Sequence, residues 1–347
     1  MKKNLSVKFF ALPLILSFGV LCVIFSDTLK QALSAALSMC AETLIPSLFV
    51  FLCLSNLALA YSDTAGGIFA RAYAFVFHLP ASTAAVFFLS LIGGYPVGAM
   101  MSARMVEEKR LARDTAQVLP LFCLASGPAF AVVVVGEGLC GSKTIGGILL
   151  LSCALSQTLI GIAIGIKNRK KPICKVETIY KRQEPFSAIL TRAVENSITA
   201  MLQICAYVML FFVLMAFVRR LPLPRSVQNV LCAMMEVSAG VQFFRHNVPM
   251  LAFILGFGGI SVLFQIKKYL HITGTKVYMF LLFRLISAAL SFGICKGLLC
   301  IFPQAVPTLA AGIQVKAVSL SAPFSAALII CFGVFILDKK HAVFSAS

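Results

Sequence analysis

Charged residues are scarce in this chain. Asp, Glu, Lys and Arg make up 12% of its 347 residues, whereas a typical soluble domain contains about 25%. Hydrophobic residues account for 60%, and Trp is absent, so Tyr, Phe, Lys and Arg would have to anchor helices at the membrane interfaces. This composition excludes a soluble globular protein, and the alternating segments of a transmembrane barrel do not dominate. We therefore predict an all-α, polytopic helical membrane protein.

Acidic residues are the scarcer of the charged kinds. Twelve Asp and Glu stand against 30 Lys and Arg, which gives a net charge of +18. The basic residues gather in short loops, as in 104–113 and 167–182. This is the positive-inside pattern of membrane proteins, and it argues against nucleic acid as a partner. Both loops are predicted to face the cytoplasm. Two spans separate them, and an even number of spans places both loops on the same side of the membrane.

Signatures of catalysis and metal binding are missing. The sequence contains no HExxH, GxSxG or P-loop motif. Its 12 cysteines form no CxxC pair and no Cys/His cluster with metal-ligand spacing. Most of them sit inside apolar runs, where cysteine serves as a small packing residue. We expect no enzyme, no metal and no cofactor.

Apolar segments long enough to cross a bilayer, about 20 residues each, recur along the chain. They lie near 9–26, 34–60, 81–103, 116–136, 144–166, 198–218, 248–266, 277–299 and 319–337. Segments 66–80 and 226–246 are only partly apolar, so the number of spans is open by roughly two. The first segment is interpreted as a retained anchor over 1–29, because no clear small-residue cleavage site follows it.

Two glycine pairs interrupt apolar runs. Gly93-Gly94 is followed by Tyr95 and Pro96, and Gly258-Gly259 lies between Phe257 and Ile260. Adjacent glycines and a proline weaken the helical hydrogen-bond ladder. At membrane depth such a break is tolerated only where the freed groups face protein or a water-filled cavity. We predict broken helices at both pairs, lining a site between two repeats.

A third break is predicted at Ser126-Gly127-Pro128, inside the span 116–136. Ser126 is expected to cap the half-helix that restarts there, whose N-terminus would offer N–H groups and a positive dipole to an anion. The alternative is a simple proline kink that serves packing.

Polar and charged residues at membrane depth are the other candidates. Arg284 lies near the start of the span 277–299; it either faces a cavity, where its planar fork suits a carboxylate, or snorkels to the headgroups. The remaining polar residues at this depth, which bond either to a neighbouring helix or to a solute, are Gln203, Ser261 and Gln265. Acidic residues that would pair with an arginine or bind a coupling cation are Glu42, Glu195 and Glu236.

Weak internal similarity divides the chain into halves. Pro46-Ser47-Leu48-Phe49 and Leu202-Gln203-Ile204-Cys205 are each followed by a glycine pair and then by another span. This predicts a duplicated unit, with Ser47 and Gln203 as matching positions of the site. The resulting organisation is an anchor over 1–29, a first repeat over 30–166, a basic loop over 167–185, a second repeat over 186–300, and a C-terminal transmembrane helix and tail over 301–347.

Several of these motifs resemble one family. Glu42-Thr-Leu-Ile-Pro-Ser-Leu-Phe49, Gly93-Gly-Tyr-Pro-Val-Gly-Ala99 and Ala125-Ser-Gly-Pro-Ala-Phe130 are similar to the signature of the YlbJ sporulation integral membrane proteins. The second-half motifs Glu236-Val-Ser-Ala-Gly240 and Gly256-Phe-Gly-Gly-Ile-Ser-Val262 resemble it less specifically. Val50 and Ala125 depart from the family's pattern, which has Pro and Thr or Asn there. The resemblance extends from about 30 to 300.

The resemblance implies two gate-like, nucleoside-recognition-like repeats, as in concentrative nucleoside transporters, in a bacterial cell membrane. It implies transport of dipicolinic acid, a small planar dicarboxylate, during sporulation. The partners expected are this anionic solute and the lipid bilayer, and a homo-oligomer is left open. Two alternatives remain: a protein that organises spore envelope or cortex assembly without transport, and a transporter of nucleosides or another neutral solute.

Overall fold

The computed structural model describes residues 3–61, 67–169 and 185–302, and within these ranges every regular element is helical. The elements up to the basic loop are α1 (Lys3–Ile24), α2 (Ser26–Ser38), η1 (Met39–Leu44), α3 (Ile45–Ala60), α4 (Ile68–Phe77), η3 (Ala81–Thr83), α5 (Ala84–Gly93), α6 (Tyr95–Glu107), α7 (Arg113–Ala116), η4 (Leu119–Leu121), η5 (Ala129–Leu139) and α8 (Lys143–Asn168). Those after it are α9 (Phe186–Val218), α10 (Arg225–Met235), α11 (Val237–Phe243), α12 (Val248–Phe257), α13 (Ile260–Thr273) and α14 (Val277–Ile301).

Several helices are long and apolar enough to cross a membrane. Among the described residues there are five, or six if the bent pair α4 and η3–α5 is counted as one span; the five are Ser26–Ala60, Lys143–Asn168, Phe186–Val218, Val248–Thr273 and Val277–Ile301. The chain is therefore an all-α polytopic membrane protein, as predicted. The expected C-terminal helix within 301–347 and most of the basic loop 167–185 fall outside the described residues.

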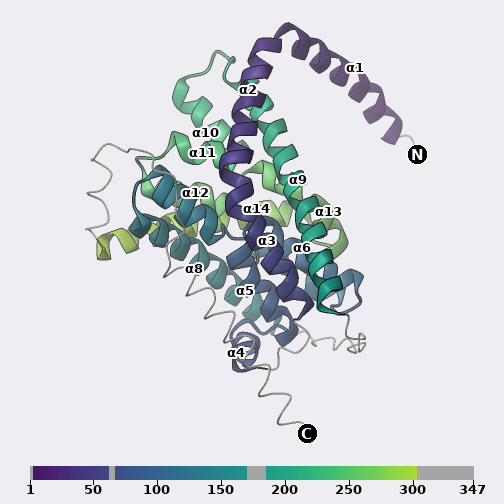
Figure 1. Ribbon diagram of the computed structural model, residues 1–347, viewed down its shortest axis with the longest axis vertical. Coiled ribbons are helices and arrows are strands. Elements are labelled where there is room, and N and C mark those ends of the chain that lie inside the picture. The colour runs from purple at the N-terminus through teal and green to yellow at the C-terminus, as the bar shows by residue number, and fades with distance from the viewer. Residues whose placement is uncertain (1–2, 62–66, 170–184, 303–347) are drawn as a thin grey trace.

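The N-terminal boundary differs from the prediction. α1 ends at Ile24, and α2, η1 and α3 then form one continuous helix from Ser26 to Ala60. The break thus precedes the expected boundary at residue 29, and the predicted span 34–60 is only the later part of this long helix. α1 points away from the rest of the chain (Figure 1), and apolar side chains such as Val23 and Ile24 are exposed on it.

Two long helices form one side of the molecule. α2–α3 and α9 run side by side (Figure 1). Asn56 Nδ2 on α3 donates a hydrogen bond of 3.0 Å to Ser197 Oγ on α9, and both residues are buried. A hydrogen bond of this kind between apolar helices supports helix association in lipid.

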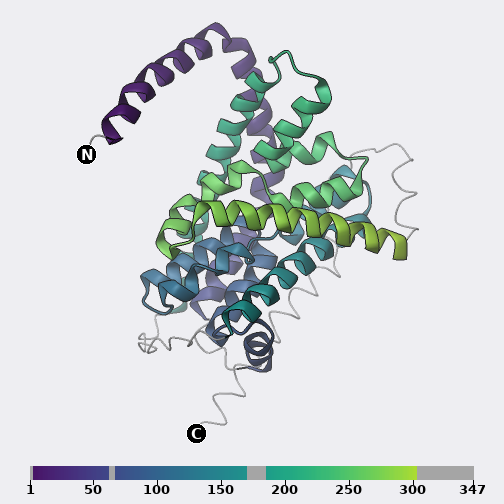
Figure 2. The same ribbon diagram turned by 180° about the vertical axis from the view of Figure 1, so that it is seen from behind.

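α14 crosses the other side of the molecule at a steep angle to α2 and α9 (Figure 2). It packs on α8 and α12. Buried polar groups join α8 to α14: Ser156 Oγ donates to the Ser287 carbonyl at 3.0 Å, and Gln157 Nε2 donates to Ser287 Oγ at 2.8 Å.

Helices break at the two glycine pairs, as predicted, and also at Glu236. In the first half, α5 and α6 meet at Gly94, and residues 124–127 have no helical structure before η5. In the second half, α10 and α11 meet at the extended residue Glu236, and α12 and α13 meet at Gly258-Gly259. The predicted spans 81–103, 116–136 and 248–266 are therefore each broken, and the ambiguous segment 226–246 contains a break as well.

The two breaks of each half touch one another. A Cβ placed on Gly127 would lie 3.0 Å from Gly94 N, and one on Gly259 would lie 3.4 Å from Glu236 Cα. Each half thus contains a long helix, two broken helices in contact, and another long helix. In this order Gly258-Gly259 corresponds to Ser126–Pro128, and Glu236 corresponds to Gly93-Gly94. Sequence similarity had instead matched the two glycine pairs.

Candidate functional site

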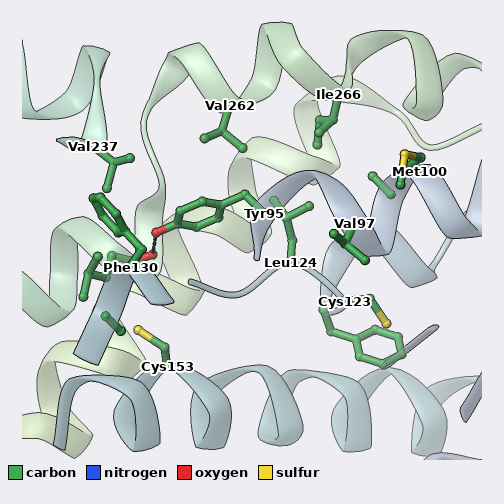
Figure 3. Packing of buried hydrophobic residues seen from close by; sticks show 14 of the residues in the cluster. Tyr95, Val97, Met100, Cys123, Leu124, Phe130, Cys153, Val237, Val262 and Ile266 are labelled. Atoms are coloured by element: carbon green, nitrogen blue, oxygen red, sulfur yellow. Dashed lines mark hydrogen bonds between the residues drawn. The ribbon is translucent and has the colours of Figure 1, made fainter. Parts of the chain in front are cut away.

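A cavity of about 50 Å³ lies where the halves meet. Both first-half breaks, the Glu236 break and four further helices border it. Its lining residues are Leu44, Leu48, Leu52, Gly93, Gly94, Tyr95, Pro96, Gly127, Phe130, Ile204, Val208, Glu236, Val237, Ser238, Val262 and Gln265. Figure 3 shows Tyr95 and Phe130 of the first half beside Val237 and Val262 of the second.

The Gly-Gly-Tyr-Pro-Val-Gly sequence is explained by this geometry. Gly94 has φ +86°, a conformation in which an L side chain is strained. Four residues later, a Cβ on Gly98 would overlap the carbonyl oxygen of Cys123, so glycine allows α6 to lie directly against the non-helical segment that leads to the Ser126–Pro128 break. Pro96 sits in the first turn of α6, where its missing N–H costs no helical hydrogen bond.

The end of α12 exposes carbonyl groups that the rest of the molecule satisfies. The last four carbonyls of a helix have no partner within it. Gly258 N donates to the Ile254 carbonyl at 2.8 Å, and Tyr95 Oη donates to the Leu255 carbonyl at 2.8 Å (Figure 3). Tyr95, which follows the first glycine pair, therefore completes the hydrogen bonding at the second.

Arg284 satisfies the last two carbonyls of α12. Its Nε donates to Phe257 O at 2.8 Å and its Nη2 to Gly256 O. Its Nη1 donates to Leu124 O, which lies at the Ser-Gly-Pro break and also accepts from Gln157 Nε2 at 3.0 Å. The guanidinium thus joins breaks of both halves, and it lies 5.9 Å from the Tyr95 ring centroid.

Arg284 is 1% exposed and does not line the cavity. The snorkelling alternative is therefore wrong, because a side chain that reached the headgroups would be exposed. Its predicted role as a carboxylate ligand stays a prediction, since its donors point at backbone carbonyls in this conformation.

Glu236 is the acidic residue that lines the cavity. It is 2% exposed, and its Oε1 accepts hydrogen bonds from Ser238 N at 3.1 Å and Ser238 Oγ at 2.8 Å. Its Oε2 has no hydrogen-bond partner among the described residues. Among the described residues Glu236 makes no ion pair with an arginine, and Arg245 Nε donates to His246 Nε2 at 2.9 Å.

The predicted site residues fall into three groups. Those that line the cavity are Gly93, Gly94, Tyr95, Pro96 and Gly127. Those buried at the breaks but behind the lining are Ser126, Pro128, Gly258, Gly259, Ser261 and Arg284. Those elsewhere are Ser47, whose hydroxyl donates to carbonyls of its own helix, and Gln203, which is exposed on α9.

The predicted cap by Ser126 is also absent. No side-chain hydrogen bond caps η5, and Ser126 Oγ has no hydrogen-bond partner among the described residues although it is fully buried. η5 begins with wide π-type turns after Pro128, and such turns are frequent at functional sites.

Sequence reasoning missed much of the apolar lining and the central place of Glu236. Phe130, Val237 and Val262 belong to apolar runs in which no feature marks the inward face. Glu236 carried a signal, since an acidic residue in an apolar stretch is a functional hypothesis by default, but the structure was needed to place it opposite Gly94.

The chain was compared with known proteins. No protein-family model matches it, and no solved structure matches it. The sporulation integral membrane protein YlbJ of Bacillus subtilis (strain 168) is 24% identical over 302 residues, with 74% of each chain covered. The chain is thus similar, over most of its length, to a sporulation integral membrane protein, in agreement with the resemblance seen in its motifs.

Proposed function

We propose that this protein carries a small anionic solute, dipicolinic acid, across the bacterial cell membrane during sporulation. One observation carries the proposal: helix breaks from both halves of a membrane protein converge on a single cavity. In transporters, solute sites are typically formed by discontinuous helices at the interface between repeats. The two gate-like repeats implied by the resemblance would then move relative to one another around this site.

The first-half breaks suit an anion. α6 and η5 both begin at the cavity, where Gly94 and Gly127 present backbone without side chains. The N-terminal end of a helix carries partial positive charge and unpaired N–H groups, which favour a carboxylate. A planar dicarboxylate could approach this backbone closely because no Cβ stands in the way.

The cavity is too small to hold the proposed solute in this conformation. About 50 Å³ exceeds the ~10–15 Å³ that one water needs. It is far smaller than the ~300–1,000 Å³ pockets that hold organic ligands. Transport therefore requires the halves to separate. The hydrogen bonds from Tyr95 to Leu255 O and from Arg284 to Leu124 O cross between the halves, so such a movement would change them.

The choice of solute rests on the resemblance. The curated relative is named as a sporulation protein, and the resemblance implies dipicolinic acid as the solute. The absence of catalytic motifs is consistent with transport. The predicted cytoplasmic side of loops 104–113 and 167–182 remains part of this proposal; in the first loop, Glu108 pairs with Arg104 and Arg110 at 3.1 and 3.2 Å.

Uptake by reconstituted protein tests the proposal. The full-length chain in liposomes should take up radiolabelled dipicolinate well above protein-free liposomes, and should leave uridine outside. Uptake of uridine instead would favour the neutral-solute alternative. If neither compound enters and folded protein is present in the liposomes, transport is rejected in favour of an organising role in the spore envelope.

A further inference from the structure

Glu236 is a buried carboxylate with one oxygen left over. Its Oε1 is held by Ser238 N and Ser238 Oγ, whereas Oε2 lacks a hydrogen-bond partner among the described residues. The residue is 2% exposed and lines the cavity opposite Gly94 and Gly127. A carboxylate with one unpartnered oxygen therefore borders the space that we assign to the solute.

No positive charge compensates this carboxylate in the part of the chain that the structure describes. The other titratable groups near it are Tyr95, which lines the same cavity, and the buried Cys40 on η1. Ser261 Oγ on α13 lies close enough to interact with the carboxyl group, but it makes no hydrogen bond of ordinary geometry among the described residues. Arg284 lies beyond the Tyr95 ring, with its donors on backbone carbonyls.

An unpaired ionised carboxylate is costly in a medium of low dielectric constant. It is neutralised either by a proton or by a bound cation, and acidic residues within membrane segments commonly mark such sites. An anionic solute in the same cavity is a second reason for Glu236 to be neutralised, because two like charges at short range repel. Neutralising Glu236 and binding the anion should therefore favour one another.

A proton fits the available groups better than a metal ion. Calcium takes six to eight oxygen ligands, and magnesium takes six. The described residues contain no cluster of three His, Cys, Asp or Glu side chains that could hold a metal. Among the described residues, the buried oxygens without partners near this carboxyl group are Glu236 Oε2 and Ser261 Oγ. A proton on Oε2 needs a single oxygen, and Ser261 Oγ is placed to accept its hydrogen bond.

We propose that Glu236 is the proton-coupling site and that the protein is a proton–anion symporter. This inference rests on the proposed function. Glu236 Oε2 takes a proton from water on the side from which the anion enters. The neutral carboxyl group and the anion occupy the widened cavity together, and both leave on the other side, so that Glu236 is ionised again.

Proton movement in wild-type proteoliposomes is the first test. A pH-sensitive dye trapped inside should report acidification when dipicolinate is added outside. With the membrane potential clamped, an inward gradient of one pH unit should raise the steady-state accumulation ratio by about tenfold per proton. Uptake that moves no protons, or that requires sodium, would overturn the coupling while leaving transport intact.

Glu236→Gln separates coupling from transport. A glutamine mimics the protonated carboxyl group, so the variant should still exchange internal for external dipicolinate without a gradient. It should lose the response to a pH gradient and the dye signal. Glu195→Gln is the matched control, because Glu195 is exposed on α9, and it should behave as wild type.

The outcomes are distinguishable. A Glu236→Gln variant that still accumulates dipicolinate along a pH gradient would reject Glu236 as the coupling residue. If the variant does not fold, the wild-type dye signal alone decides whether protons move. Absence of any uptake or exchange by the folded wild-type protein would reject the transport proposal itself, and the coupling with it.

Discussion

The two pairs of helix breaks share a geometry and differ in what they bring to the cavity. The first-half breaks, at Gly94 and at 124–127, touch through backbone and contribute two helix N-termini. The second-half breaks, at Glu236 and at Gly258-Gly259, also touch through backbone but contribute a carboxylate. Glycine supplies the close approach in both halves. Helices begin at the cavity in both halves as well, but the first turn of α11 is capped by the Glu236 carboxylate, whereas no side chain caps α6 or η5.

The halves also differ in how their breaks are stabilised. The carbonyls at the end of α12 are satisfied by Tyr95 from the first half and by Arg284 from α14. Within the described ranges, the hydroxyl of Ser126 at the first-half breaks has no hydrogen-bond partner, and neither has that of Ser261 after the second glycine pair. Buried polar groups without partners are costly, so these hydroxyls are candidates to contact water or solute.

Gly98→Ala, at the first-half breaks, should cause the largest loss of folding stability. Its Cβ would overlap the backbone at Cys123, which cannot rotate away as a flexible side chain would. Overpacking costs about 1–3 kcal/mol and sometimes more, and we expect the upper end or beyond. Thermal unfolding in detergent would measure the loss.

Gly147→Ala is the matched control for Gly98→Ala, since nothing lies within 4 Å of its Cβ position on α8. If both variants unfold at the wild-type temperature, the direct packing of α6 on the segment that leads to the Ser126–Pro128 break is refuted.

Arg284→Met should cause the next largest loss of stability, and it acts mainly on the end of α12. It removes every donor to Gly256 O and Phe257 O, whereas Leu124 O keeps Gln157 Nε2. Each buried carbonyl left unpaired costs roughly 1–3 kcal/mol, partly offset because a charge is no longer buried. A lower unfolding temperature and less folded protein in membranes are expected.

Arg225→Met serves as the control for Arg284→Met, because Arg225 is exposed at the start of α10. Should Arg284→Met keep full stability yet lose dipicolinate binding, Arg284 would be a solute ligand and not a structural contact.

Tyr95→Phe should have the smallest effect. It removes one hydroxyl, the donor to Leu255 O, at a cost of about 1 kcal/mol. The aromatic ring still fills its place beside Gly258. A small fall in unfolding temperature is expected, with Tyr278→Phe as the exposed control; a fall as large as that of Arg284→Met would show that the hydroxyl, and not the guanidinium, dominates this contact.

The sequence predicts the fold class and the places where helices break, because both depend on local composition. Long apolar runs identify α8 and α14 within a few residues, and Gly94, Gly127 and Gly258 mark the breaks. The inward faces were not predictable. Ser47 and Gln203 lie on helices that are apolar on nearly all sides, so their sequence does not show which side faces the site.

Contacts between distant parts of the chain could not be predicted from the sequence, for a different reason. The hydroxyl of Tyr95 reaches a carbonyl 160 residues away, and Arg284 reaches Leu124 over the same separation. Only the tertiary packing shows that the groups freed at one break are satisfied by residues near another. The place of Glu236 beside the first-half breaks depends on that packing as well.

A structure of the full-length protein with dipicolinate, determined at mildly acidic pH, tests the central claim most directly. We predict solute density between the backbone at Gly94 and Gly127 on one side and Glu236 on the other, in a cavity larger than that described here. Solute bound away from these breaks, or a midplane that remains packed and empty of solute at saturating concentration, would contradict the account.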